Sequence, residues 1–574
     1  MSESGAGQTE QQRSTEPDRS TERQRSQAAD SINSQGKVPL RLRIGITGHR
    51  NIARDHPGLA SEIAKAAEYI TQVLAADSER LSSTDLGHGK RGDVVVTVVS
   101  SLAEGADRVV AGELLKRKGT QLEVVLPLPQ SDYVHDFGSL ESVEQFNSLI
   151  SRAVDTDVLR TATSREQAYE QAGRAVVDRS DAMIVVWDGQ PARGRGGTAE
   201  IYTYAQRWQK PTLLIRVDDH SARLDADQLP QAAKDTIPLP TGSIKRLDQY
   251  NHERLKDGVF DKAPPLLAQI ESRPWLESAG PQIGHFSRYF TRADQLAGRF
   301  QSRYLWAIRS LYILAPLAVL VAALQVVFWP DHEHYAWFEF AILILITLLF
   351  AATRGLRWHE RWISARYLAE QIRSLVFLGL IGMITPEKSV LPGSRETVGD
   401  SGWTERAANE IWFARPRYVP PADISLLIEV LCEEWIKKQQ EYHIKVDRSF
   451  RRQRDLIQAA AIGLFGLSAL FALLHSLTVG STKSQPFKWW DLLAIAIPAI
   501  AAGLGAYGAQ RDYLRHAERS KLFASVLDDG ITQLMAAQDL SGIQQTAVSV
   551  SRSMRSEATD WYSVVRVQDA ELPS

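Results

Sequence analysis

The chain has 574 residues, which is too long for one compact domain, and a typical domain of about 150 residues predicts three or four units. Its 66 basic and 68 acidic residues give a formal net charge of -2, so nothing in the charge balance favours nucleic acid as a partner. The single cysteine, Cys432, excludes an intramolecular disulfide framework and a cysteine-based zinc site, and we expect it in the core of an amphipathic helix.

Residues 1–37 are mostly Ser, Gln, Arg, Glu and Gly, without the apolar stretch of a signal peptide. Such a segment cannot bury enough apolar surface to offset its loss of entropy on ordering, so we predict a disordered tail.

Residues 38–220 alternate between strand-like and helix-like patterns. The expected strands are 40–47, 93–100, 122–126, 182–187 and 212–217, and the expected helices are 59–76, 106–118, 166–179 and 198–209. This alternation predicts an α/β domain with a Rossmann-like, doubly wound parallel sheet that is covered by helices on both faces. Residues 221–287 contain many prolines and are predicted to be a linker with short helices.

Four long apolar runs follow, at residues 311–328, 340–353, 456–477 and 492–509. A helix needs about 20 residues to cross the apolar core of a bilayer, so we predict an all-α membrane domain with four transmembrane helices. A buried core helix in a soluble bundle is the alternative for each run. Arginines flank the outer ends of the runs, whereas the connections within each pair hold only Lys483 and Lys488. This asymmetry predicts a multi-pass protein of the cell (inner) membrane, with both termini and the N-terminal domain cytoplasmic.

The membrane part contains an internal repeat. Phe300 and Phe450 each lie on a basic helix before a pair of spans, and Arg361 and Arg511 each follow a pair, at an offset of 150 residues. We therefore predict two repeated hairpin units at 288–380 and 438–535, a cytoplasmic connector at 381–437 and a cytoplasmic C-terminal tail at 536–574. The partners expected from this organisation are the lipid bilayer and further copies of the chain. The absence of charged residues from the span interiors argues against an ion-coupled transporter.

Glycine-rich or small polar segments follow three of the expected strands. Parallel strands end at one edge of a sheet, where ligands bind, and glycines and helix N-termini there present backbone N–H groups to phosphate. We therefore predict a nucleotide-like small molecule as the ligand, without a cofactor, a metal or a catalytic residue. The candidate ligand-binding residues are Gly45, Thr47, Gly48, His49, Arg50, Ser100, Ser101, Ala103, Glu104, Gly105, Asp107, Asp188, Gly196, Gly197, Thr198 and Glu200.

Several of these side chains also fit structural roles. His49 is a turn residue or a base, and Arg50 contacts phosphate or faces solvent. Glu104 and Glu200 bind ribose hydroxyls or cap their helices.

Segments 45–50, 100–107 and 196–200 resemble the SLOG superfamily, which implies a Rossmann-like fold over residues 40–217 and a ligand derived from a nucleotide. The two-span units resemble SLATT domains, which are membrane effectors of bacterial conflict systems. Phosphoribohydrolases of the SLOG superfamily carry a Gly-Gly-x-Gly-Thr-x-x-Glu loop with a catalytic glutamate. Here Glu200 follows Thr198 one residue too early, which turns its carboxylate by about 100° on a helix.

The leading hypothesis is therefore a sensor–effector that binds a nucleotide-derived signal and changes membrane permeability in antiphage defence. The alternatives are a membrane-anchored nucleotide-processing enzyme and a passive membrane tether for a ligand-binding domain.

Overall fold

A computed structural model describes the protein over most of its length. The described residues are 35–50, 52, 56–82, 94–159, 164–191, 194–218, 220–225, 241–262, 266–267, 273–383, 402–416, 418–478 and 485–567. Almost all of the tail predicted to be disordered, residues 1–37, lies outside them.

The N-terminal domain is built on a seven-stranded sheet with the strand order β4-β3-β2-β1-β5-β6-β7. Its strands are β1 (Arg41–Gly48), β2 (Val95–Ser100), β3 (Gln121–Leu126), β4 (Asp155–Val158), β5 (Ala182–Trp187), β6 (Thr212–Val217) and β7 (Ala222–Leu224). Neighbouring strands are parallel except for β6 and β7, which are antiparallel. The predicted Rossmann-like fold is thus confirmed, with one antiparallel strand added at the edge.

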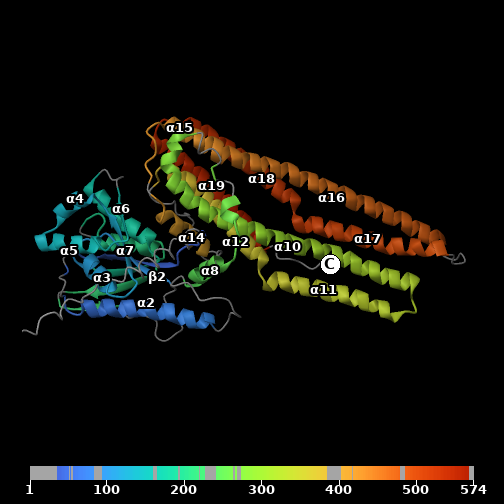
Figure 1. Ribbon diagram of the computed structural model, residues 1–574, viewed down its shortest axis with the longest axis horizontal. Coiled ribbons are helices and arrows are strands. Elements are labelled where there is room, and N and C mark those ends of the chain that lie inside the picture. The colour runs from blue at the N-terminus through green and yellow to red at the C-terminus, as the bar shows by residue number, and fades with distance from the viewer. Residues whose placement is uncertain are drawn as a thin grey trace, which may run out of the picture.

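Helices cover both faces of this sheet (Figure 1). On one face, Ile184 and Val186 of β5 join a core with α2 (Leu59–Ser82) and α3 (Ala106–Leu114). On the other face, Met183 and Val185 pack with α6 (Arg165–Arg179) and α7 (Thr198–Arg207). Burial on both faces explains why this strand is a continuous apolar run and not an alternating one.

Residues 221–287, which were predicted to be a linker with short helices, contain such helices and also one strand of the sheet. Strand β7 lies in the stretch that the sequence analysis assigned to the linker, and α8 (Thr241–His252), α9 (Val259–Lys262) and η3 (Pro274–Ala279) follow it. Earlier in the chain, α4 (Gln130–Tyr133), η1 (Val134–Asp136) and α5 (Leu140–Ile150) connect β3 to β4. These short helices form one side of the sheet edge that is described below.

The rest of the chain is helical. The helices are α10 (Gly280–Phe328), α11 (Ala336–Gly355), α12 (Trp358–Leu380), α14 (Gly402–Phe413), α15 (Ile424–Val430), a π-helical segment η5 (Leu431–Ile436), α16 (Lys437–Thr478), α17 (Gln485–Arg511), α18 (Tyr513–Met535) and α19 (Leu540–Val567). Four helical stretches are long and apolar enough to cross a membrane, as predicted, and they contain α10, α11, α16 and α17. Cys432 is buried in η5, in agreement with its expected core position.

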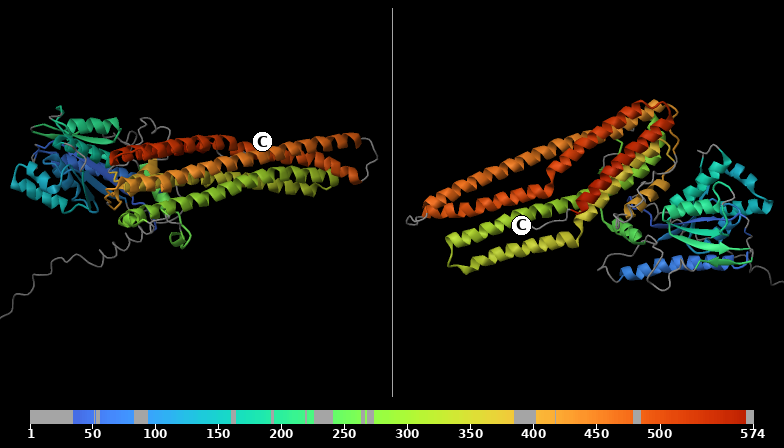
Figure 2. Two further views of the ribbon diagram at one scale, coloured as in Figure 1. Left: turned by 90° about the horizontal axis from the view of Figure 1, so that it is seen from above. Right: turned by 180° about the vertical axis from the view of Figure 1, so that it is seen from behind.

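The molecule is elongated, with the sheet at one end and the spans at the other (Figures 1 and 2). Between them lies a bundle that we call the stalk, formed by α12, α18 and α19 with the non-spanning halves of α10 and α16 (residues 280–310 and 437–455).

The two hairpin units have the same construction. In each unit the second span ends at a non-glycine residue in the left-handed region, Arg357 with φ 50° and Asp512 with φ 41°, and the next stalk helix begins there. The ring of Phe300 lies 5.7 Å from the guanidinium of Arg361, and Phe450 lies 5.9 Å from the equivalent His516. The repeat is therefore structural. Equivalent residues of the two units are 150 positions apart at the first spans and 155 positions apart at the helix breaks. The second unit is therefore longer, either within its second span or in the connection before it.

Candidate ligand site

The carboxyl ends of β2, β1 and β5 lie side by side in the centre of the sheet. From β1 the chain proceeds through β2, β3 and β4 on one side and then crosses to β5 and β6 on the other, so the strand order reverses between β1 and β5. Open α/β sheets bind ligands outside the carboxyl ends at such a switch point. The three loops selected from the sequence therefore converge at one edge.

The loop after β1 is closely packed against its neighbours. A Cβ on Gly48 would lie 2.5 Å from the Cβ of Ala106, so only glycine lets the start of α3 approach the strand. The His49 N–H donates to the Val186 carbonyl at 3.2 Å, and His49 Nε2 lies 2.6 Å from Asp188 Oδ1. The ends of β1 and β5 are thus joined by a histidine–aspartate pair at the switch point.

The loop after β2 contains a buried carboxylic acid. Asp107, in the first turn of α3, accepts a hydrogen bond from the Ser100 hydroxyl at 3.2 Å. Burial raises the pKa of Asp107 to about 7, although the bonds from Ser100 and the Ala103 N–H and the charges of Arg50 and Arg108 oppose this rise. An acid of this kind changes its proton occupancy near neutral pH, as groups at functional sites often do.

The backbone of this loop has a positive φ at two residues, which glycine adopts freely and which strains only Leu102. Gly105 has φ 79°, and a Cβ there would lie 2.3 Å from the Arg50 carbonyl oxygen. Leu102 also lies in the left-handed region, with φ 51°. Strained backbone of this kind collects at ligand sites, where the surrounding structure holds it in place.

Arginine and tyrosine side chains form the wall of the site on the side of α6. The guanidinium of Arg50 lies 4.6 Å from the ring centroid of Tyr169, which is a cation–π distance, and its charge acts on Asp107. The Tyr169 hydroxyl is buried without a hydrogen-bond partner in the described part of the chain. Tyr133 lies fully buried beside Tyr169, with ring centroids 6.0 Å apart.

The third loop leads into α7. Gly196 has φ 77°, and a Cβ there would lie 2.7 Å from the Glu170 nitrogen. Its N–H donates to Glu200 Oε2 at 2.8 Å, and Glu200 also lies 3.8 Å from Arg174. Glu200 therefore holds the loop before α7 in place, and it does not cap the helix itself.

Two of the helices that open at this edge lack side-chain caps. Helices α3 and α7 begin after Gly105 and Gly197 with no side-chain cap. By contrast, Ser139 and Ser164 cap α5 and α6 with their hydroxyl groups. An uncapped helix N-terminus presents N–H donors and a partial positive charge, which suits an anion such as phosphate.

The structure brings most of the predicted residues together, but two have other surroundings. Gly45 lies inside β1 and faces α6, where a Cβ would meet Ser180 Oγ at 2.3 Å, so it serves strand–helix packing. Glu104 accepts hydrogen bonds from the Gly138 N–H at 2.9 Å and from the Ser142 hydroxyl, so it fastens the segment before α5. The remaining predicted residues lie in the three loops, at or next to the strand ends and helix starts: Thr47, Gly48, His49, Arg50, Ser100, Ser101, Ala103, Gly105, Asp107, Asp188, Gly196, Gly197, Thr198 and Glu200.

Tyr133, Tyr169 and Arg108 were missed by sequence reasoning. Arg108 donates to the Leu102 carbonyl at 2.9 Å and to Ser142 at 2.7 Å, so it links the β2 loop to α5. The two tyrosines lie in helices that carry no recognisable motif. The position of Arg108, directly after the predicted Asp107, is the one feature of the sequence that could have indicated this wall.

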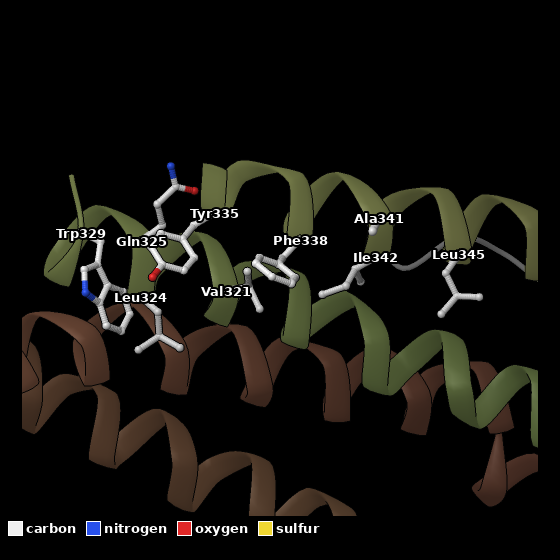
Figure 3. Close-up of a pocket in the computed structure, with 9 residues that line it drawn as sticks. All are labelled: Val321, Leu324, Gln325, Trp329, Tyr335, Phe338, Ala341, Ile342 and Leu345. Carbon is white, nitrogen blue, oxygen red and sulfur yellow. The ribbon is translucent and has the colours of Figure 1, made fainter. Parts of the chain in front are cut away.

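An apolar hollow lies between α10 and α11, far from the sheet (Figure 3). Its wall is apolar except for Gln325 and Tyr335, and Val321, Phe338 and Ile342 point into it. Since it offers no charged group, it does not suit a nucleotide, and it belongs to the lipid-facing part of the molecule.

The sheet is joined to the stalk at the edge opposite the candidate site. Arg406 of α14 donates to both carboxylate oxygens of Asp181, at 2.9 and 2.8 Å, just before β5 begins. Glu410, also on α14, pairs with the buried Arg43 of β1, which in turn bonds Glu123 of β3 at 2.9 Å. Charged pairs therefore attach the amino ends of the central strands to the connector helix.

The fold and the four spans define a multi-pass membrane protein with a Rossmann-like domain. Residues 288–377 match the family described as SMODS and SLOG-associating 2TM effector domain 3. This segment contains part of α10, all of α11 and most of α12, so the resemblance of the first hairpin unit to SLATT domains is confirmed. No match was found among curated proteins. The SLOG resemblance of the sheet domain and the SLATT resemblance of the second hairpin unit stay predictions.

Proposed function

We propose that this protein is a membrane-bound sensor–effector of bacterial antiphage or conflict defence. A nucleotide-derived ligand binds at the carboxyl edge of the sheet, in a cytoplasmic SLOG-like domain. Binding alters the attachment of the sheet to the stalk, and the four spans in the inner membrane then change the permeability of the bilayer. The family that matches residues 288–377 is described as an effector that associates with SLOG domains, which supports this assignment.

One observation carries the ligand-binding half of the proposal. Two uncapped helix starts, after Gly105 and Gly197, meet the cation of Arg50 at a single switch point. Backbone N–H donors beside a guanidinium favour phosphate, and the ring of Tyr169, which packs on the buried Tyr133, supplies an aromatic surface for a base.

The enzyme alternative is less well supported. Glu200, the counterpart of a hydrolase glutamate, accepts the Gly196 N–H and lies near Arg174. A carboxylate that is used to hold its own loop is poorly placed to act on a substrate.

The proposal is tested by reconstituting the full chain in liposomes that hold a fluorescent dye. Nucleotides and cyclic oligonucleotides are added in turn, and each is assayed for breakdown as well as for dye release. Release with an intact ligand is expected. It should be lost in Gly197→Trp and Arg50→Ala and retained in Arg207→Ala, a control at the opposite end of α7.

Two other outcomes contradict the proposal. Ligand breakdown without dye release identifies an anchored enzyme. Ligand binding with neither release nor breakdown identifies a tether. In cells, the proposal predicts that phage infection lowers membrane potential only where the intact ligand site is present.

A further inference from the structure

The four spans lie in a row and do not form a closed bundle. They follow one another in the order α16, α17, α10, α11 (Figure 1), and α17 packs against both α16 and α10. Within the described residues, neither α11 nor α16 packs substantially against a further span. The row therefore ends in two different helices, each with one unpartnered apolar face.

The contact between α10 and α17 in the middle of the row is close. A Cβ on Gly503 would lie 2.7 Å from Pro316 Cγ, and the rings of Tyr312 and Tyr507 meet edge to face with centroids 5.7 Å apart. Here the first span of one unit packs against the second span of the other. Small residues that admit a neighbour closely are typical of helix contacts within membranes.

Because of the internal repeat, the residues that α10 contributes to this contact have counterparts on α16, and those that α17 contributes have counterparts on α11. These two helices are the opposite ends of the row. At the register of 150 residues for the first spans, Pro316 corresponds to Gly466 and Tyr312 to Ile462, both on α16. At the register of 155 residues for the second spans, Gly503 corresponds to Leu348 on α11. Ile462 and Leu348 are 64% and 63% exposed, so these faces are uncovered in the single chain.

We propose that copies of this chain associate head to tail, with α16 of one copy packed against α11 of the next. This contact repeats between copies the arrangement that α10 and α17 have within one copy. It also continues the order of the row, in which a first span always lies beside a second span running in the opposite direction.

Such an interface is heterologous and not two-fold, so it generates a ring if the rotation closes and an open row if it does not. A ring covers the exposed faces of all outer helices, and an open row covers all of them except the two at its ends. The inference rests on the span packing alone, and it holds whether or not the chain senses a nucleotide.

Disulfide cross-linking in native membranes tests the proposed interface. In a Cys432→Ala background, Gly466→Cys is combined with Leu348→Cys, the counterparts of Pro316 and Gly503. Mild oxidation is expected to give a ladder of dimers, trimers and larger species on a non-reducing gel. A second pair, Ile462→Cys with Ala352→Cys, should give the same ladder, because it matches the contact of Tyr312 with Tyr507.

Three controls make the outcome decisive. Pro316→Cys with Gly503→Cys should cross-link within one chain, which shows that the spans have folded in the proposed register. Leu467→Cys with Leu348→Cys should give no ladder, because Leu467 lies about 100° around the helix from Gly466. Each single-cysteine variant should remain monomeric on the gel.

The proposal is overturned if the internal pair cross-links and neither test pair gives a ladder. It is also overturned if Gly466→Cys or Leu348→Cys alone gives dimers, since like-to-like contact indicates a two-fold interface.

Discussion

Replacement of the buried acid Asp107 by asparagine should change how the stability of the sheet domain depends on pH. Asp107 is almost fully buried, and burial raises its pKa from 3.8 to about 7 despite the bonds from Ser100 and the Ala103 N–H. Asparagine has nearly the same shape as the protonated acid but does not titrate in this range. The Asp107→Asn variant therefore isolates the contribution of this one proton.

The magnitude follows from the difference in pKa between the folded and unfolded states. One pKa unit corresponds to 1.36 kcal/mol, so a rise from 3.8 to about 7 is worth about 4 kcal/mol. Because the folded state binds the proton more tightly, the stabilisation is complete below about pH 4 and is lost as the pH rises through 7. The free energy of unfolding of the wild-type domain, relative to Asp107→Asn, should therefore fall by about 4 kcal/mol between pH 4 and pH 8.

Hydrogen exchange measured by mass spectrometry suits this test, because it reports on β2 and α3 separately from the membrane part. Exchange rates are corrected for the intrinsic effect of pH and compared between the two proteins. Burial also lowers the pKa of His285 and of His443 to about 4, which makes stability rise with pH. Both histidines are present in each protein and cancel in the difference. An identical pH dependence in wild type and Asp107→Asn would refute the assignment of a raised pKa.

Three further outcomes are expected. Gly105→Ala should lower the stability of the sheet domain by more than about 1 kcal/mol in urea unfolding, because its φ of 79° and the nearby carbonyl leave no room for a Cβ. Gly112→Ala, which has open space around it, should leave the stability unchanged. Arg406→Met removes the arginine partner of the Asp181 carboxylate and should lower the free energy of unfolding by about 3 kcal/mol or more. Proteolysis between sheet and stalk should become faster, and unchanged cleavage argues against this attachment. A reporter inserted after residue 333 should be exposed outside the cell and one at residue 400 inside, and the reverse result would invert the proposed topology.

The sequence was most informative where one local pattern decides the structure. The bounds of β5 and β6 agree with the predicted strands, because largely apolar runs suit strands that are buried on both faces. The spans were equally clear, since long runs without charge fit few environments other than a bilayer. The convergence of the three loops was also predictable, because parallel strands end at the same edge.

Long-range contacts were not predictable in this way. Strand β4 has the sequence Asp-Thr-Asp-Val, with almost no apolar character, and is a strand because it pairs with the edge of β3. The ion pair between Arg406 and Asp181 joins residues 225 positions apart, and no local pattern announces it. The direction of the Glu104 side chain likewise depends on Ser142, which lies on a helix the sequence analysis did not identify.

Helix α6 is the element best placed to connect the ligand edge to the stalk. Its first turns carry Tyr169 and Glu170 at the candidate site. About 15 Å from Tyr169, given 1.5 Å per residue, its last turn carries Arg179, whose guanidinium lies 4.9 Å from the ring centroid of Phe413 on α14. A ligand that moves Tyr169 would therefore displace a rigid helix whose other end rests on the connector.

Phe413→Ala removes this contact without touching the ligand edge. Ligand binding, measured by calorimetry on the full chain, should remain at the wild-type level while ligand-induced dye release is lost. Phe413→Tyr keeps the ring and should restore release. If Phe413→Ala binds and releases as the wild type does, the signal does not pass through the α6–α14 contact. The ion pairs of Arg406 with Asp181 and of Glu410 with Arg43 then remain as direct routes from the sheet to α14.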